Sequence, residues 1–169
     1  GCYQASLTPR FGFIGPASWK PNLRTVHALT KNVFPFVDKP FEFVLAGKGW
    51  EKEPILFPRL YRNLGYVKNI SDFWNSIDVL IAPTQQGAGV NVKICEALHY
   101  GVPVITNEKS ARAIFGDRSF PPNLFIMNSD QDISCLLNKL KFPISRKPCL
   151  EFAKFKLESK LFEFLENSP

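Results

Sequence analysis

The chain has 169 residues, a length that fits one domain. Hydrophobic residues make up 45% and charged residues 21%, which excludes a chain that is disordered throughout. Lys and Arg outnumber Asp and Glu by 21 to 15, and the resulting net charge of +6 favours an anionic partner. A nucleotide, a nucleic acid and an acidic membrane surface all fit that charge.

The chain shows no membrane or export signal. No apolar run approaches the ~20 residues that a membrane-spanning helix needs, and residues 1–10 lack the basic and apolar regions of a signal peptide. We therefore expect a cytoplasmic location, with peripheral contact to the cytoplasmic membrane face left open. Because the first residue is Gly1 rather than Met, we also expect a piece of a longer protein.

The cysteines do not form a metal or redox motif. Their positions have neither knuckle nor CxxC spacing, and a chain of this size does not need disulfides, so reduced thiols are expected. Cys95 lies in an apolar helical pattern and is expected to pack as a small hydrophobic side chain. The other three are Cys2, Cys135 and Cys149.

The first elements alternate between strand and helix. Residues 11–15 form a short apolar run ending in glycine, which predicts a buried strand. Apolar residues at helical spacing predict a helix over residues 23–33, with Pro21 suited to its first turn and Pro35 ending it. A second strand is expected at residues 41–46.

The middle of the chain continues the alternation. Residues 47–49 read as a tight turn, and a third strand is expected at residues 60–64. The Ser71 hydroxyl is a candidate cap for a short helix over residues 72–76. A fourth strand is expected at residues 78–83, where the continuous apolar run 79–82 predicts burial on both faces.

The remaining elements follow a glycine-rich segment. A helix is expected over residues 91–100, ended by Gly101 in the left-handed conformation. Residues 102–106 predict a strand that starts near Pro103 or leaves one amide unpaired. A sixth strand, an amphipathic helix and a long terminal helix are expected at residues 124–127, 130–141 and 150–166.

These elements define the fold class. Continuous apolar strands that alternate with helices are typical of a parallel sheet covered on both faces. Six such strands predict a Rossmann-like, doubly wound α/β domain, with a mainly parallel six-stranded sheet and residues 1–169 as one domain. In such sheets, ligands bind beyond the carboxyl ends of the strands.

One glycine segment at such an end indicates an anion site. It runs directly into a predicted helix, whose free amides and dipole favour phosphate. Lys93 and Glu96 are three residues apart on that helix and share a face. The ammonium could reach a phosphate and the carboxylate could hold ribose hydroxyls, although a surface ion pair between them explains the spacing equally well. The segment consists of Gly87, Ala88, Gly89 and Val90.

The same region resembles a known family. Residues 87–106 read GAGVNVKICEALHYGVPVIT and resemble the donor-site signature of group 1 glycosyltransferases, G-x-G-x-x-x-K-x-x-E-A-x-x-x-G-x-P-V-x-x-T. Those enzymes use nucleotide sugars and have two Rossmann-like domains. The resemblance extends through residues 12–15, 19–22, 64–67 and 78–83, and covers nearly the whole chain, but only the C-terminal half of such an enzyme.

The resemblance implies roles for individual residues. Glu96 would bind the donor ribose, Lys93 would lie near the diphosphate, and the amides of residues 87–90 would meet the diphosphate or the sugar. Weaker donor candidates are Gly15 and Lys20 near the diphosphate, and Tyr66, Val67 and Lys68, whose backbone would read the base.

The resemblance also implies what this half lacks. A glycan or lipid-linked acceptor and a catalytic residue would depend on an N-terminal domain absent from the chain, so the isolated chain would have little activity and no catalytic residue is assigned. His27 and His99 are expected to be structural. We expect no cofactor and no metal, and a retaining hexosyl transfer. Many members carry Glu where this chain has Ala88, which leaves the donor sugar open.

Other function classes fit less well. A nucleotide-binding module without transferase chemistry is the main alternative, and Ala88 is its chief support. A nicotinamide-dependent oxidoreductase is disfavoured because no G-x-G-x-x-G follows the first strand. A nucleic-acid role would rest on charge alone, and no nucleic-acid partner is expected.

Overall fold

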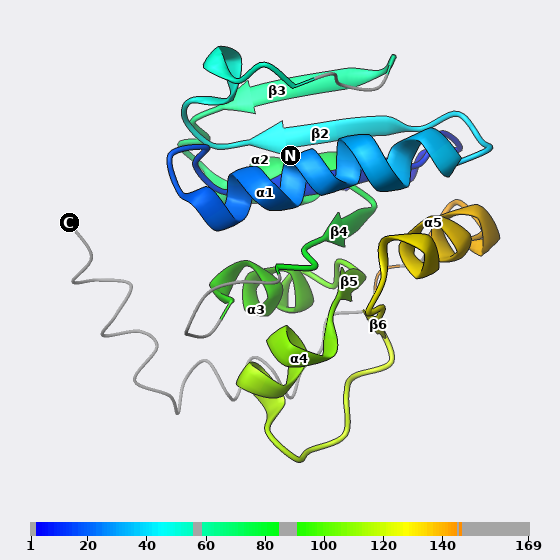
Figure 1. Cartoon of the computed structure of the whole chain (residues 1–169). Coiled ribbons are helices and arrows are strands. Elements are labelled where there is room, and N and C mark those ends of the chain that lie inside the picture. Colours follow the sequence, from blue (N-terminus) through cyan, green and yellow to red (C-terminus); the bar gives the residue numbers. More distant parts are fainter. Residues whose placement is uncertain (1–2, 56–58, 85–90, 145, 147–169) are drawn as a thin grey trace.

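The computed structural model describes residues 3–55, 59–84, 91–144 and 146 (Figure 1). Within them, parallel strands form one sheet in the order β3-β2-β1-β4-β5-β6. This order confirms the predicted Rossmann-like α/β fold. The strands are β1 (Arg10–Ile14), β2 (Glu42–Ala46), β3 (Tyr61–Gly65), β4 (Val79–Ile81), β5 (Val104–Thr106) and β6 (Leu124–Ile126).

Helices cover both faces of the sheet. One buried cluster joins the sheet to α2, α3 and α4, and a second joins it to α1 and α5; Figure 1 shows α1 and α2 on opposite sides of β2. The α-helices are α1 (Lys20–Ala28), α2 (Ile70–Ser76), α3 (Val92–His99), α4 (Glu108–Phe115) and α5 (Asp130–Lys139).

Strand β2 shows why both faces are covered. Phe43 and Leu45 belong to the cluster on the α1 side, whereas Val44 and Ala46 belong to the cluster on the α2 side. All four side chains are fully buried. Because successive strand residues point to opposite faces, the continuous apolar run at residues 43–46 needs a helical layer on each side.

The first helix changes geometry rather than ending at the proline. Pro21 lies in the first turn of α1, as predicted. The α-helix stops at Ala28 and continues as a π-helical turn, η1 (Leu29–Val33), and a 3₁₀ turn, η2 (Phe34–Phe36). Pro35 lies inside η2, so the prediction that it ends the helical segment is wrong. Proline is tolerated there because the amide of an early helical residue has no intrahelical partner.

The predicted Ser71 cap of α2 is also wrong. The helix begins at Ile70, and its N-cap is Asn69, whose Oδ1 accepts from the Ser71 backbone amide at 3.2 Å and from the Ser71 hydroxyl at 2.8 Å. Asn is as good an N-cap residue as Ser, and the apolar Ile70 then joins the helix and packs against the core.

Helix α4 was not predicted, although its sequence carries the usual signals. Asn107 caps it by accepting from the Ser110 amide at 2.8 Å, and Gly116 follows its last residue at φ 59°. Ala111, Ile114 and Phe115 form its buried stripe. The predicted terminal helix, residues 150–166, lies outside the described residues.

A buried ion pair holds the amino ends of the central strands. The Asp78 carboxylate, fully buried, accepts from the Arg10 guanidinium at 2.7 Å, the Arg10 amide at 2.8 Å and the Tyr3 hydroxyl at 2.7 Å. The Arg146 guanidinium lies 3.5 Å from the Tyr3 ring centroid and donates to the carbonyl of Ile77. Asp78 thereby ties residues near both limits of the described chain to the sheet.

Candidate functional site

The strand order reverses between β1 and β4, and this reversal defines where a ligand binds in folds of this kind. Neighbouring connections leave β1 and β4 toward opposite faces, which opens a crevice outside their carboxyl ends. Helix α1 follows β1, and α3 follows β4. The residues that join these two helices therefore mark the candidate site.

Lys93 and Asn22 make that connection. The Lys93 ammonium, on α3, donates to Asn22 Oδ1, on α1, at 2.8 Å. The same ammonium lies 4.2 Å from the centroid of the Phe13 ring on β1. Burial lowers the pKa of Lys93 from 10.5 to about 7. The contacts that position the ammonium are therefore the Asn22 amide oxygen and the Phe13 ring.

The loop between β1 and α1 packs closely against the turn that follows β2. Gly15 has φ 146°, and a Cβ there would lie 2.4 Å from Asn22 Nδ2. Gly47, at φ 129°, approaches so closely that its Cβ would lie 2.1 Å from the Gly15 carbonyl oxygen, which also accepts from the buried Trp50 indole at 2.8 Å. Only glycine fits these two positions. The tight turn predicted at residues 47–49 is confirmed.

The ends of β2 and β3 lie beside that loop. The Gly47 amide donates to the Gly65 carbonyl at 2.7 Å, and the Lys48 ammonium lies 4.9 Å from the centroid of the Tyr66 ring. Tyr66 is 66% exposed, whereas Val67 packs against the core. Of the predicted base-reading residues, Tyr66 and Lys68 are therefore open to solvent at this edge, as is Lys20 at the start of α1.

Polar groups join the ends of β4 and β5. Thr84, nearly buried, accepts at its carbonyl from Asn107 Nδ2 at 3.0 Å and from the Ser110 hydroxyl at 3.2 Å. Its hydroxyl accepts from Asn91 Nδ2 at 3.3 Å. Thr84 and Asn91 flank residues 85–90, and the predicted anion loop at residues 87–90 (Gly87, Ala88, Gly89 and Val90) lies outside the described residues.

Helix α3 carries the remaining candidates. Glu96 is partly buried, one turn beyond Lys93. Cys95 is 4% exposed within the core, where burial raises the pKa of its thiol to about 12, which confirms the predicted packing role. His99 is exposed, edge-on to the Tyr100 ring, and His27 is exposed at the end of α1. Gly101 has φ 71°, as predicted for the residue that ends this helix.

Two of the residues that build the site were not predicted. Asn22 and Thr84 have no charge, and no motif quoted above assigns either a polar role. Asn22 is 1% exposed, on a helix whose other buried residues are Thr25 and Val26, and the sequence signal that could have pointed to it is an amide side chain beside a proline in the first helical turn. Such an amide needs partners, because an unpaired buried polar group is costly.

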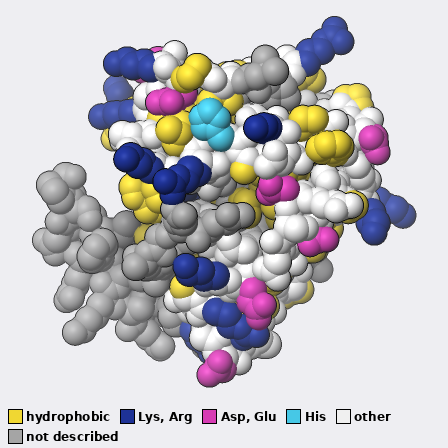
Figure 2. All heavy atoms as spheres, viewed as in Figure 1, with side chains coloured by type: hydrophobic (Ala, Val, Ile, Leu, Met, Phe, Trp, Pro, Cys, Tyr) yellow, Lys and Arg dark blue, Asp and Glu magenta, His cyan; other side chains and the backbone are white. Residues whose placement is uncertain are grey.

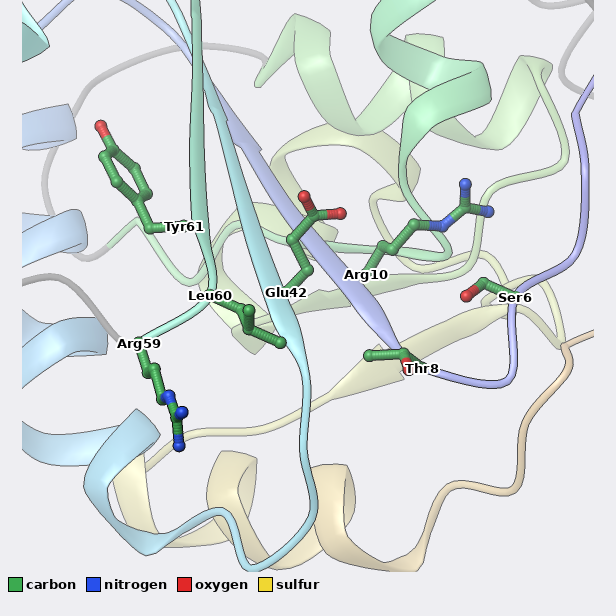
Figure 3. Close-up of a pocket in the computed structure, with 7 residues that line it drawn as sticks. All are labelled: Ser6, Thr8, Arg10, Glu42, Arg59, Leu60 and Tyr61. Atoms are coloured by element: carbon green, nitrogen blue, oxygen red, sulfur yellow. The ribbon is translucent and has the colours of Figure 1, made fainter.

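A pocket of about 310 Å³ lies at the opposite, amino-terminal edge (Figure 3). Two of the charged side chains that line it already form ion pairs: Arg10 pairs with Asp78, and the Glu42 carboxylate lies 3.0 Å from the Arg62 guanidinium. In Figure 3 the Arg59 and Tyr61 side chains point away from each other. A ligand site needs converging polar groups, so this pocket is not the candidate. Its lining is Ser6, Thr8, Arg10, Glu42, Arg59, Leu60 and Tyr61.

The charge on the visible surface is dispersed. Figure 2 shows Lys and Arg side chains at several separate places on one face, with Asp and Glu side chains between them. A nucleic-acid interface would gather them into one stripe or patch. Among the residues that the structure describes, no helix is long and apolar enough to cross a membrane.

The family of the chain follows from comparison with known proteins. Residues 8–134 match the model of the group 1 glycosyl transferases, so the chain belongs to that family. No curated protein sequence matches it significantly.

Solved structures share the fold. The crystal structure of TarM is 16% identical with a TM-score of 0.56, and the match covers 83% of this chain and 30% of that one. WaaG, a glycosyltransferase involved in lipopolysaccharide biosynthesis, is 17% identical with a TM-score of 0.55, and the match covers 79% of this chain and 38% of that one. The chain thus spans less than half the length of these structures.

Proposed function

We propose that the chain is the donor-binding domain of a glycosyltransferase, which binds a nucleotide-diphosphate sugar for transfer to a glycan or lipid-linked acceptor. The observation that carries the proposal is the Lys93–Asn22 hydrogen bond across the point where the strand order reverses. A partly buried cation at that point provides the charge that a diphosphate needs. The family membership of residues 8–134 supplies the reaction class.

The other candidates complete the donor site in this proposal. Glu96, one turn beyond Lys93 on α3, accepts from the ribose hydroxyls. The backbone of residues 66–68, beyond the carboxyl end of β3, reads the base. The amides of residues 87–90, which come between β4 and α3 in the sequence, meet the diphosphate or the sugar.

The chemistry proposed for the intact enzyme is a retaining transfer of a hexosyl group. As the bond between sugar and diphosphate breaks, negative charge grows on the departing phosphate. The Lys93 ammonium and backbone amides stabilise that charge, because preorganised donors act strongly in a site that excludes water. This proposal gives the charge-stabilising role to the chain's own groups and assigns no cofactor.

In this proposal, an N-terminal domain supplies the acceptor contacts and the catalytic residue. Residues 1–169 form one domain that has little turnover alone. The protein acts in the cytoplasm, with peripheral contact to the membrane when the acceptor is a lipid.

Binding measurements with Glu96→Gln test the proposal. Isothermal titration calorimetry would compare UDP, GDP and ADP with their nucleosides and with NAD. For the diphosphate that binds, we expect Glu96→Gln to weaken binding of both the diphosphate and its nucleoside by about 5- to 30-fold, or ~1–2 kcal/mol, because hydrogen bonds to a charged acceptor are lost.

Glu42→Gln is the matched control. Glu42 carries the same carboxylate at the opposite edge of the sheet, where it pairs with Arg62, and its replacement should leave the affinity unchanged. Equal affinity of wild type and Glu96→Gln would remove Glu96 from the donor site. Tight binding of NAD with no binding of the diphosphates would replace the proposed function by a nicotinamide-dependent one.

A further inference from the structure

Within the part of the chain that the structure describes, the Lys93 ammonium contacts groups that carry no formal charge. Its described contacts are the Asn22 amide oxygen at 2.8 Å and the Phe13 ring at 4.2 Å. The other charged or titratable side chains on the elements around it are Lys20, Arg24 and His27 on α1, Cys95, Glu96 and His99 on α3, and Arg10 on β1. Burial is the cause of the fall in the pKa of Lys93.

The contacts of the Asn22 side-chain amide fix the direction of its oxygen. Its Nδ2 donates to the Pro16 carbonyl at 3.0 Å, and its side chain is 1% exposed. Gly15 packs against the nitrogen of the same amide so closely that a Cβ at Gly15 would overlap it. With the nitrogen used by Pro16, Oδ1 must point at Lys93, and a lysine, which only donates, is the matching partner.

We propose that Asn22 is a positioning residue that leaves Lys93 free to gain a proton from solvent when a diphosphate binds. This inference rests on the proposed function of the site. A neutral amide orients the lysine nitrogen whether or not that nitrogen is charged, whereas a carboxylate at the same place would hold it permanently protonated and cancel its charge.

Protonation of Lys93 should make diphosphate affinity depend on pH. In the free protein the lowered pKa leaves Lys93 partly neutral at pH 7. A bound diphosphate favours the charged form and raises that pKa, so binding takes up protons. Affinity is therefore highest below pH 7 and declines as the pH rises, by about fivefold between pH 7 and pH 8. Over that range the diphosphate keeps its own charge, because the second pKa of a phosphate is about 6.

Two replacements of Asn22 separate positioning from mere packing. Asn22→Ala removes the acceptor of the charged form, so the titration midpoint of Lys93 should fall by about one pH unit. Asn22→Asp adds a negative charge at the same place, so the midpoint should rise by about two pH units or more, and diphosphate affinity should drop about tenfold and lose its dependence on pH between 7 and 8. A residue that only fills space would not move the midpoint in opposite directions.

The experiment is an NMR titration of lysines labelled at Cε, run on the free chain, followed by calorimetry with UDP, GDP and their nucleosides at both pH values. The resonance lost in Lys93→Met identifies Lys93. Lys31→Met, the same change at an exposed lysine in η1, is the control. Thermal melts of each variant confirm folding.

The expected result is a Lys93 midpoint near pH 7, opposite shifts in the two Asn22 variants, and diphosphate affinity that follows the midpoint while nucleoside affinity does not. A midpoint near 10.5, or shifts of the same sign in both variants, overturns the inference even if a diphosphate binds. Failure of every diphosphate to bind at either pH refutes the proposed function, and this inference with it.

Discussion

Replacing Lys93 by methionine should stabilise the chain. Methionine keeps an unbranched, apolar stem and removes a nitrogen whose described contacts, the Asn22 amide oxygen and the Phe13 ring, carry no formal charge. Charged groups buried without a counter-ion cost stability, and sites built for ligands retain that cost. Lys93→Met should therefore lose an anion-binding group and gain folding stability.

The expected gain in the free energy of unfolding follows from the lowered pKa of Lys93. A pKa lowered from 10.5 to about 7 corresponds to about 5 kcal/mol of lost stability, at about 1.4 kcal/mol for each pH unit. Lys93 keeps some exposure, so water offsets about half of this, which leaves a gain of about 2–3 kcal/mol for Lys93→Met at pH 7. For a chain of this size, that corresponds to a rise in Tm of about 4–12 °C.

The pH dependence follows from linkage. Below pH 7 the lysine is protonated in both folded and unfolded chains, so the full penalty persists. Between pH 7 and 10.5 the unfolded chain binds more protons, so wild-type stability rises with pH and the advantage of the variant shrinks. The advantage should fall by about half between pH 7 and pH 9.

Urea unfolding at the two pH values, followed by circular dichroism, measures both quantities. Lys31→Met should change neither. A variant no more stable than wild type at pH 7, or a gain of equal size at both pH values, would refute the claim that Lys93 is a buried, uncompensated cation.

Two further predictions concern the fold. Asp78→Asn should lower the free energy of unfolding by about 3–5 kcal/mol, since it leaves the Arg10 guanidinium with an uncharged partner; urea unfolding checks this, and a loss under about 1 kcal/mol would show that the buried pair contributes little. Asn69→Ala should cost about 1 kcal/mol through loss of the α2 cap, whereas Ser71→Ala should cost less; thermal melts that rank the two in the opposite order would restore Ser71 as the capping residue.

The sheet and its covering helices could be predicted because their signals are local. Strands such as β2 contain a continuous apolar run, and glycines such as Gly101 mark the ends of helices. The Ser71 cap could not be predicted from residue type, because Asn69 and Ser71 are both favourable caps and the choice depends on whether Ile70 is buried. Helix α4 has an N-cap residue and an apolar stripe, but the stripe is short. A short stripe between two predicted strands is a weak signal for a helix, so α4 was not predicted.

The candidate site was predicted only in part. Lys93 and Glu96 follow from a long sequence motif, and the structure places both on α3 after β4. The role of Asn22 could not be predicted, because it depends on a hydrogen bond between residues 71 positions apart. The environment of Lys93 likewise depends on tertiary burial, so the sequence left a surface ion pair with Glu96 as an equal alternative.

The most direct test of the donor site is to map nucleotide binding by amide chemical shifts. The ¹H–¹⁵N spectrum of the labelled chain would be followed during titration with the nucleoside diphosphate that binds in calorimetry. We expect the largest changes at Gly15, Asn22 and Lys93, at the carboxyl edge between β1 and β4. Changes concentrated instead at Ser6, Thr8 and Arg59, around the pocket at the amino-terminal edge, would contradict the proposed donor site.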